Sequence, residues 1–292
     1  MMEQVTQAVP DKSDSGFSEF KRRLFRNKAA IFGVIILSLM FLCAVFAPWL
    51  ALSDYTRQDL PSMLQAPSWG HPFGTDEFGR DIYSRIIYGA RVSLVVGFLA
   101  VGISLFIGLL LGSLAGYFGG FIDHGICALI DIALAFPMTL LAIGIIAILG
   151  PSLFNVCLAI AASSWAAFAR VVRGQFLSLK SQEFVEAARI LGFSDTRIIL
   201  RHIFPNAIAP VVVLATLEVP KAIIVEATLS FLGLGVQPPI PSWGSIISSG
   251  RSFLFEAPWI TLFPGLMIVL VVMGFNLFGD ALRDSLDPRL RN

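Results

Sequence analysis

The segment "EFVEAARILGFSDTRIILRHIFPN", residues 183–206, interrupts an apolar chain with a series of charged side chains. The apolar runs on either side of it are each long enough to cross a bilayer. A helix rises about 1.5 Å per residue, so a hydrocarbon core of about 30 Å needs about 20 apolar residues. The segment itself has a glycine near its middle and a proline near its end. It therefore predicts a short, charged, helical excursion on one surface of a membrane protein.

The composition of the whole chain supports this interpretation. Of 292 residues, 56% are hydrophobic and only 14% are charged, and the mean hydropathy is +0.78. Soluble domains carry about 25% charged residues. We therefore predict an all-α polytopic membrane protein with six transmembrane helices. They are expected near residues 30–50, 91–117, 125–149, 152–173, 207–231 and 259–279.

The distribution of lysine and arginine predicts the orientation. With six spans, fifteen of these residues lie on the side of the N-terminus and five on the other side, and Lys221 lies within a span. Cytoplasmic loops carry such an excess, so both termini are predicted to be cytoplasmic. The predicted organisation is as follows: a cytoplasmic tail at 1–28, a first transmembrane helix at 29–50, an external segment at 51–90, a core with five transmembrane helices at 91–282, and a cytoplasmic tail at 283–292. The core contains the charged loop at 180–205 and an external loop at 232–258.

The charged loop has the pattern of two short helices joined by a glycine turn. Apolar residues recur at the helical spacing i, i+3, i+4 and i+7. Gly192 ends the first helix, because glycine readily adopts the left-handed conformation found there. Ser194 or Asp195 can cap a second helix that runs through His202. The apolar stripe consists of Phe184, Ala187, Ala188 and Leu191. From the residues alone, the stripe fits either a groove in a partner protein or the lipid surface.

Other features exclude several classes of protein. A net charge of +1, without a cluster of basic and aromatic residues, gives no support for a nucleic-acid partner. Cys43, Cys127 and Cys157 lie in apolar runs and are interpreted as small hydrophobic residues. The three histidines form no pair at ligand spacing, so no metal site is predicted. No phosphate-binding loop occurs, since the nearest candidate, beginning at Gly97, has no lysine.

Three glycines, Gly108, Gly112 and Gly116, follow one another at four-residue spacing in the second predicted span. Such spacing lets another helix approach closely, because no side chain separates the two backbones. We expect the neighbour to be a helix of the same chain.

Motifs along the chain resemble those of a known family. The order E-A-A, three residues, Gly, nine residues and then I-x-L-P is found in the cytoplasmic loop of bacterial ABC importer permeases. Glu186, Ala187, Ala188, Gly192 and Pro205 fall at these positions, while His202 and Phe204 replace the usual Ile and Leu. The blocks "FGTDEFGRDIYSRIIYGARVSL", "LSFLGLGVQPPIPSWGSII" and "FNLFGDALRDSLDPRLR" are similar to those of the C-type permease subunit of dipeptide, oligopeptide and nickel importers.

This resemblance implies a type I ABC importer permease in the bacterial inner membrane, moving its substrate by alternating access. The implied partners are a homologous second permease, two cytoplasmic ATPase subunits and an extracytoplasmic solute-binding protein. The chain itself would bind no cofactor and catalyse no reaction, because ATP is used by the ATPases. The charged loop would couple the ATPases to the transmembrane helices. Glu186 would make a polar contact with the ATPase, and Ala187 and Ala188 would allow close approach. Gly192 would form the turn, and Pro205 would set the angle to the fifth span.

The fifth span contains the charged residues Glu218, Lys221 and Glu226. Charges at this depth are costly and face a partner or a watery cavity. Glu218 and Lys221 are three residues apart and can pair, whereas Glu226 projects about 140° from Lys221 and needs another partner or a place near the outer surface. These residues either line the transport pathway or form a structural ion pair. We favour the ion pair.

Other classes of membrane protein remain as alternatives. An ion-coupled secondary transporter is the first, although no inverted repeat is evident. A channel would need a filter segment. A membrane enzyme would need a catalytic cluster, and Asp76 with Asp81 is better explained by turn and cap roles. The substrate stays open among dipeptides, oligopeptides, nickel chelates, glutathione and opines.

Overall fold

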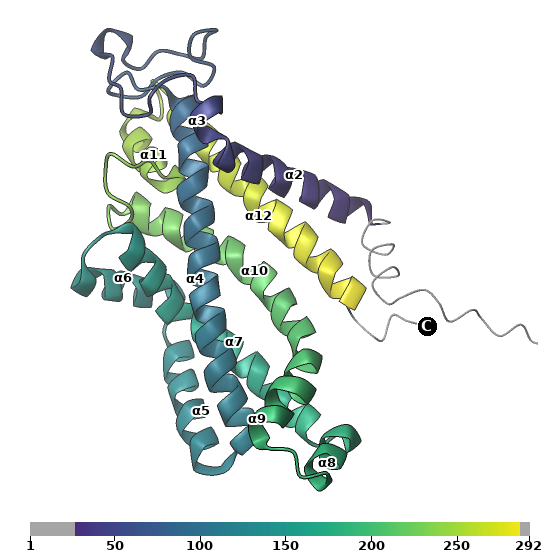
Figure 1. Cartoon of the computed structure of the whole chain (residues 1–292). Coiled ribbons are helices and arrows are strands. Elements are labelled where there is room, and N and C mark those ends of the chain that lie inside the picture. Colours follow the sequence, from purple (N-terminus) through teal and green to yellow (C-terminus); the bar gives the residue numbers. More distant parts are fainter. Residues whose placement is uncertain (1–26, 287–292) are drawn as a thin grey trace, which may run out of the picture.

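The computed structural model describes residues 27–286, and in this range the chain forms helices and loops with no β-strand (Figure 1). The all-α prediction is therefore confirmed. The α-helices are α2 Lys28–Val45, α3 Ala47–Leu50, α4 Ile82–Phe118, α5 Gly120–Ala135, α6 Met138–Leu149, α7 Leu153–Lys180, α8 Glu183–Ile190, α9 Asp195–Ile198, α10 Phe204–Phe231, α11 Trp243–Gly250 and α12 Trp259–Leu286. Two 3₁₀ turns, Leu60–Ser62 and Arg251–Phe253, and one π-helical turn, Ile199–Ile203, complete the list.

Five helices are long and apolar enough to cross a membrane, namely α2, α4, α7, α10 joined to α9, and α12. The third predicted span, 125–149, is not a straight helix. It is the pair α5 and α6, which are bent by 93° relative to each other. Pro137 explains the break, since the residue before a proline is pushed out of the helical conformation. Phe136 accordingly has φ −95° and ψ 138°.

Several boundaries differ from the predicted ones. α4 begins at Ile82 rather than 91, because the carboxylate of Asp81 caps it by accepting a hydrogen bond of 2.8 Å from the backbone N–H of Ser84. The external segment predicted at 51–90 therefore ends at 81. α12 continues to Leu286, so the predicted tail at 283–292 begins as helix. The N-terminal tail predicted at 1–28 lies almost entirely outside the described residues.

The centre of the molecule is the contact between α4 and α7. A Cβ added at Gly112 would lie 2.6 Å from the carbonyl oxygen of Ala169, and one at Gly116 would lie 2.6 Å from Cβ of Phe176. Gly108 meets α7 equally closely. The glycine series thus packs against a helix of the same chain, as predicted, and the two backbones approach more closely than larger residues would allow.

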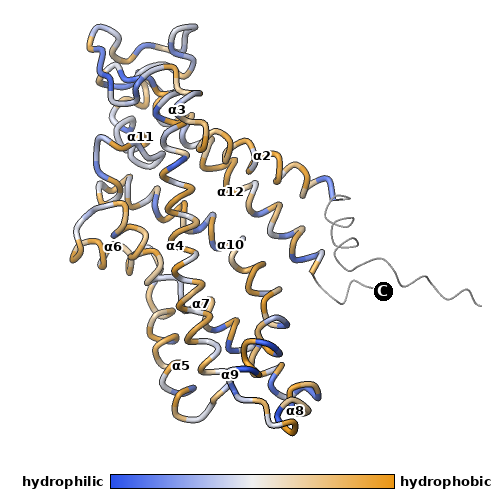
Figure 2. Tube along the Cα trace, viewed as in Figure 1, coloured by the Kyte–Doolittle hydropathy of each residue, from blue (hydrophilic) through white to orange (hydrophobic). Residues whose placement is uncertain are grey.

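The polar residues collect at the two ends of this helical body. One end carries α3, α11 and the loops before α4, and the opposite end carries α8 and α9 (Figure 1). Figure 2 shows hydrophilic residues at both ends and mostly hydrophobic helices between them. This distribution is that of a protein whose middle lies in a bilayer.

Candidate functional site

The excursion predicted from residues 183–206 is a compact hairpin of α8 and α9 beyond the ends of the long helices (Figure 1). Gly192 has φ +74° and forms the turn, as the sequence predicts. Two side chains of α8, Val185 and Ala188, are buried, with exposed fractions of 0% and 3%. Ala188 therefore packs within this chain. Ala187 is the exposed one.

The outer surface of this hairpin carries exposed apolar side chains among its charged ones. Ile190 and Leu191 are 86% and 71% exposed, and Phe184 is 40% exposed. Glu186 is exposed beside them. The predicted stripe is thus divided, because Ala188 faces inward while Phe184 and Leu191 face outward.

Hydrogen bonds tie the hairpin to the C-terminal end of α4. The hydroxyl of Tyr117 donates to the carboxylate of Asp195 at 2.5 Å, and the Lys180 ammonium donates to the Tyr117 carbonyl at 2.5 Å. The first bond holds the hairpin to α4 through a charged acceptor, and the second holds the end of α7 to the same residue of α4. No local sequence pattern predicts this role of Tyr117, because the two residues are 78 positions apart.

Aromatic stacking orders the turn itself. The ring of His202 stacks on Phe193 with centroids 5.8 Å apart, and the Arg197 guanidinium lies 4.1 Å from the Phe193 centroid. His202, which replaces the usual Ile of the motif, therefore packs against Phe193 within the loop.

The second half of the hairpin is continuous with the next span. α9 passes through the π-helical turn into α10, so the predicted separate helix through His202 is not observed. The N–H of Phe204 donates to the carbonyl of Ile199, five residues earlier. Pro205 follows directly, and because it has no N–H, the altered bonding of the π turn accommodates it.

The predicted ion pair in α10 is present. The Lys221 ammonium lies 2.7 Å from a carboxylate oxygen of Glu218. Glu218 is buried, whereas the Lys221 side chain is 58% exposed on the side of the helix bundle. The cation therefore stands on a surface of this chain at the level of the spans.

Glu226 has different partners, as its helical position requires. It is completely buried and accepts hydrogen bonds from Ser230 in the same helix, at 2.7 Å, and from Ser93 of α4, at 3.3 Å. This carboxylate joins α10 to α4 inside the bundle and lines no surface of the chain.

The opposite end of the molecule holds a second cluster of charges. Asp76 accepts hydrogen bonds from the N–H groups of Phe78 and Arg80, both at 2.9 Å, and lies 2.7 Å from Nε of Arg80. Asp81 caps α4 and contacts His71 at 3.0 Å. Turn and cap roles therefore account for both aspartates, as predicted.

A cavity of about 350 Å³ lies between this cluster and the loop before α11. Its lining includes Glu77, Arg80 and Arg85 from one segment and Pro239, Ile240 and Ser249 from the other. The two segments predicted to be external thus meet around a cavity lined by charged and apolar side chains, an arrangement that the sequence pattern does not reveal.

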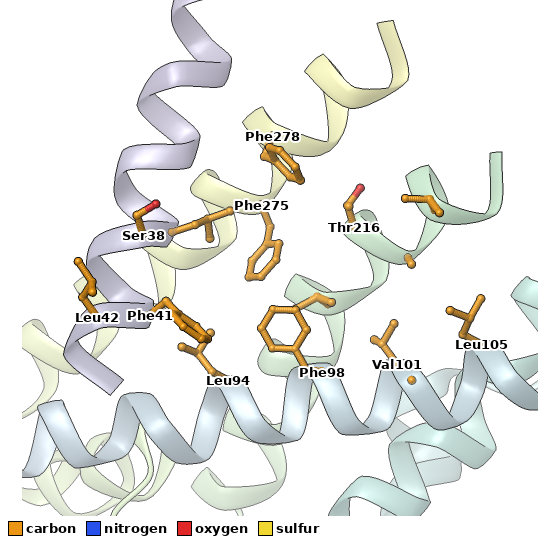
Figure 3. Close-up of a pocket in the computed structure, with 15 residues that line it drawn as sticks. Ser38, Phe41, Leu42, Leu94, Phe98, Val101, Leu105, Thr216, Phe275 and Phe278 are labelled. Atoms are coloured by element: carbon orange, nitrogen blue, oxygen red, sulfur yellow. The ribbon is translucent and has the colours of Figure 1, made fainter. Parts of the chain in front are cut away.

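A larger crevice of about 790 Å³ lies among α2, α4, α10 and α12 (Figure 3). Figure 3 shows Phe98 and Phe275 directed into the space between these helices, with their ring centroids 5.9 Å apart. Ser38 and Thr216 supply the hydroxyl groups of the lining, which has no charged side chain. The crevice offers no group that could recognise a charged solute. Among the described residues, no group of three His, Cys, Asp or Glu side chains could hold a metal ion.

Comparison with known families identifies the chain. The model described as "Binding-protein-dependent transport system inner membrane component" matches residues 108–292, which is more than half of the sequence. The chain belongs to this family. A second model, "N-terminal TM domain of oligopeptide transport permease C", matches residues 15–67. Such inner membrane components are permeases of bacterial ABC importers, a class that works with ATPases, a substrate-binding protein and a second permease.

Curated relatives match over nearly their full length. The dipeptide transport system permease protein DppC of Alkalihalophilus pseudofirmus is 51% identical, over 95% of this chain and 91% of the relative. The di/tripeptide transport system permease protein DppC of Pseudomonas aeruginosa is 44% identical, over 95% and 94%. The glutathione transport system permease protein GsiD of Escherichia coli is 45% identical, over 97% and 93%.

A solved structure shares the fold. A chain of the inward-facing MetNI methionine ABC transporter aligns with a TM-score of 0.57 at 18% identity, over 70% of this chain and 97% of its own length. This binding-protein-dependent permease therefore has the fold of a type I ABC importer permease, and the ion-coupled secondary transporter is excluded. The hairpin of α8 and α9 lies within the matched family region, at the position where the sequence motif placed the coupling loop.

Proposed function

We propose that the chain is one of two permease subunits of an ATP-driven importer whose cargo is a short peptide or a peptide-like solute. The cargo class is supported by the names of the relatives, which include dipeptide, di/tripeptide and glutathione permeases. Transport by alternating access follows, because ATP binding and hydrolysis shift the population between two conformations.

The observation that carries this proposal is the hairpin of α8 and α9. It projects from the helical body, exposes Ile190 and Leu191, and is fixed beneath by Val185 and by the bond between Tyr117 and Asp195. An exposed apolar face on a rigidly anchored short helix suits a groove in a partner protein. We assign Glu186 and Ala187 to contacts with an ATPase at the cytoplasmic face, Gly192 to the turn and Pro205 to the junction with α10.

The exposed Lys221 supports a second membrane partner. An ammonium at the level of the spans is costly against lipid. A homologous permease covering this side of α10 would either shield the pair of Lys221 and Glu218 or form with it the wall of the pathway. The chain would bind no cofactor and catalyse no reaction, with ATP hydrolysed by separate subunits.

Photo-crosslinking of the purified transporter tests the assignment of the hairpin. A photoreactive amino acid at Leu191 should crosslink to the ATPase, identified by mass spectrometry of the product. The matched control is the same label at Phe255, which is fully exposed at the opposite end of the molecule. ATPase crosslinks from Phe255 but none from Leu191 would contradict the assignment.

A further inference from the structure

The cavity beside Arg85, at the end opposite α8, has the size of a small-molecule site. Its volume of about 350 Å³ lies within the range of about 300–1,000 Å³ found for such sites. Charged side chains from the segment before α4 and from its first turn form one wall, and residues around α11 form another. In the proposed orientation this end faces outward, where cargo arrives.

Arg85 is the feature of this cavity that calls for a ligand. Its exposed fraction is 5%, and its Nε and Nη1 atoms have no hydrogen-bond partner among the described residues. The neighbouring carboxylate oxygen, Oδ2 of Asp76, lies 3.5 Å from Nε and already accepts a hydrogen bond of 2.7 Å from Arg80. Buried guanidinium N–H groups without hydrogen bonds are unfavourable, so an anion that accepts from them would stabilise Arg85.

Glu77 has a carboxylate oxygen that accepts no hydrogen bond. One of its carboxylate oxygens lies 3.3 Å from Nη2 of Arg80, whereas the other, Oε2, is buried and has no partner among the described residues. The cavity thus combines guanidinium N–H groups that make no hydrogen bond with a carboxylate oxygen that accepts none. Phe78 and Ile240 add apolar surface to the same lining.

We infer that this cavity binds the free carboxylate of a short peptide at Arg85, with a peptide N–H or the terminal ammonium at Glu77. A ligand that carries both an anion and N–H donors satisfies both residues at once. The small volume favours a free peptide over the surface of a protein. The inference rests on the proposed function, because it gives the cargo of the importer an initial site between the two external segments.

Equilibrium binding of a radiolabelled dipeptide, alanyl-alanine, tests this site. The full chain, with the subunits that co-purify with it, is placed in lipid nanodiscs, and the variants Arg85→Gln and Arg57→Gln are compared with the wild type. Arg57 is exposed in the same segment but does not line the cavity, so it is the matched control. We expect Arg85→Gln to weaken binding about tenfold or more, the size expected for a hydrogen bond between charged groups. Arg57→Gln should bind as the wild type does, and equal binding by both variants would overturn the site.

A second arm changes the ligand, so it does not depend on how a variant folds. Alanyl-alanine amide lacks the carboxylate and should bind the wild type about tenfold more weakly than alanyl-alanine. Acetate should compete poorly, because it has no N–H groups for Glu77. Wild-type protein that binds the amide equally well, or acetate equally well, would overturn the recognition of a peptide at this cavity.

Transport measured separately distinguishes this inference from the proposed function. Wild-type proteoliposomes that import the dipeptide while Arg85→Gln binds and imports it equally would refute the site and leave the importer function intact. Conversely, dipeptide binding that depends on Arg85, in a preparation that imports no peptide, would support the site and refute the proposed cargo.

Discussion

Replacing Gly192 with valine should uncouple transport from ATP hydrolysis without preventing membrane insertion. Gly192 has φ +74°, and a Cβ at this position would meet no atom within 4 Å. The substitution therefore creates no clash with other parts of the chain, and its cost arises from the backbone alone. The left-handed conformation costs about 1–2 kcal/mol for residues other than glycine, and more for β-branched residues.

This conformational free-energy cost falls on the turn after a short helix, α8. α8 has eight residues, and the turn that follows it is held by hydrogen bonds from Gly192 to Arg189 and from Phe193 to Ala188. A penalty of about 1.4 kcal/mol lowers the population of the native turn, relative to a competing conformation, about tenfold. We expect the affinity of the ATPase for the permease to fall by about this factor in Gly192→Val. In Gly192→Asn it should fall less, because asparagine adopts the left-handed conformation more readily.

The assay is the binding of purified ATPase to permease in nanodiscs, together with the ratio of transported solute to hydrolysed ATP. Gly150→Val is the matched control, since Gly150 also has a positive φ of +80° and open space around it but lies in the turn between α6 and α7. Wild-type affinity and coupling in Gly192→Val would refute the reasoning. Equal damage by Gly150→Val would show that the effect is one of general stability.

Three further predictions concern the helical body. Gly108→Leu should lower the free energy of unfolding by about 1–3 kcal/mol, because the neighbouring helix α7 leaves no space for a side chain. A Cβ at Gly102 in the same helix meets nothing within 4 Å. The stability of the control Gly102→Leu, measured by thermal unfolding, should therefore lie within about 0.5 kcal/mol of wild type. Tyr117→Phe loses the hydrogen bond to α9, worth about 1.5–3 kcal/mol for a charged acceptor, and hydrogen exchange of α9 amides should accelerate; unchanged exchange would contradict the anchoring role. Lys221→Met leaves a buried carboxylate unpaired, so adding Glu218→Gln should restore stability, with a coupling energy of about 0.5–3 kcal/mol; additive effects would argue against the pair.

The sequence was sufficient for those features that depend on local pattern. Apolar length predicted the helical class, the position of Gly192 predicted its left-handed turn, and the spacing of Glu218 and Lys221 predicted their pairing. The glycine series at Gly108 predicted close packing, because four-residue spacing creates a groove along one helix face whichever helix fills it.

The features that escaped prediction depend on contacts between distant segments. Pro137 lies within an apolar run, so hydropathy concealed the bend between α5 and α6. Ala188 and Ala187 are equivalent in the pattern, and only the packing of α8 decides which of them is buried. The missing hydrogen bonds at Arg85 likewise arise because Asp76 Oδ2 already accepts from Arg80.

The junction at Pro205 connects the hairpin of α8 and α9 directly to a long helix. From Asp195 to Phe231 the helical path is unbroken over 37 residues, or about 55 Å. A tilt of about 5° imposed at α9 would displace the far end of a rigid rod of this length by about 5 Å. Pro210 and Pro220 lie within the rod, and each removes a backbone hydrogen bond. Pro220, where the helix bends more easily, is followed directly by Lys221. Part of any movement imposed on the hairpin would therefore rotate the Lys221 ammonium about the helix axis.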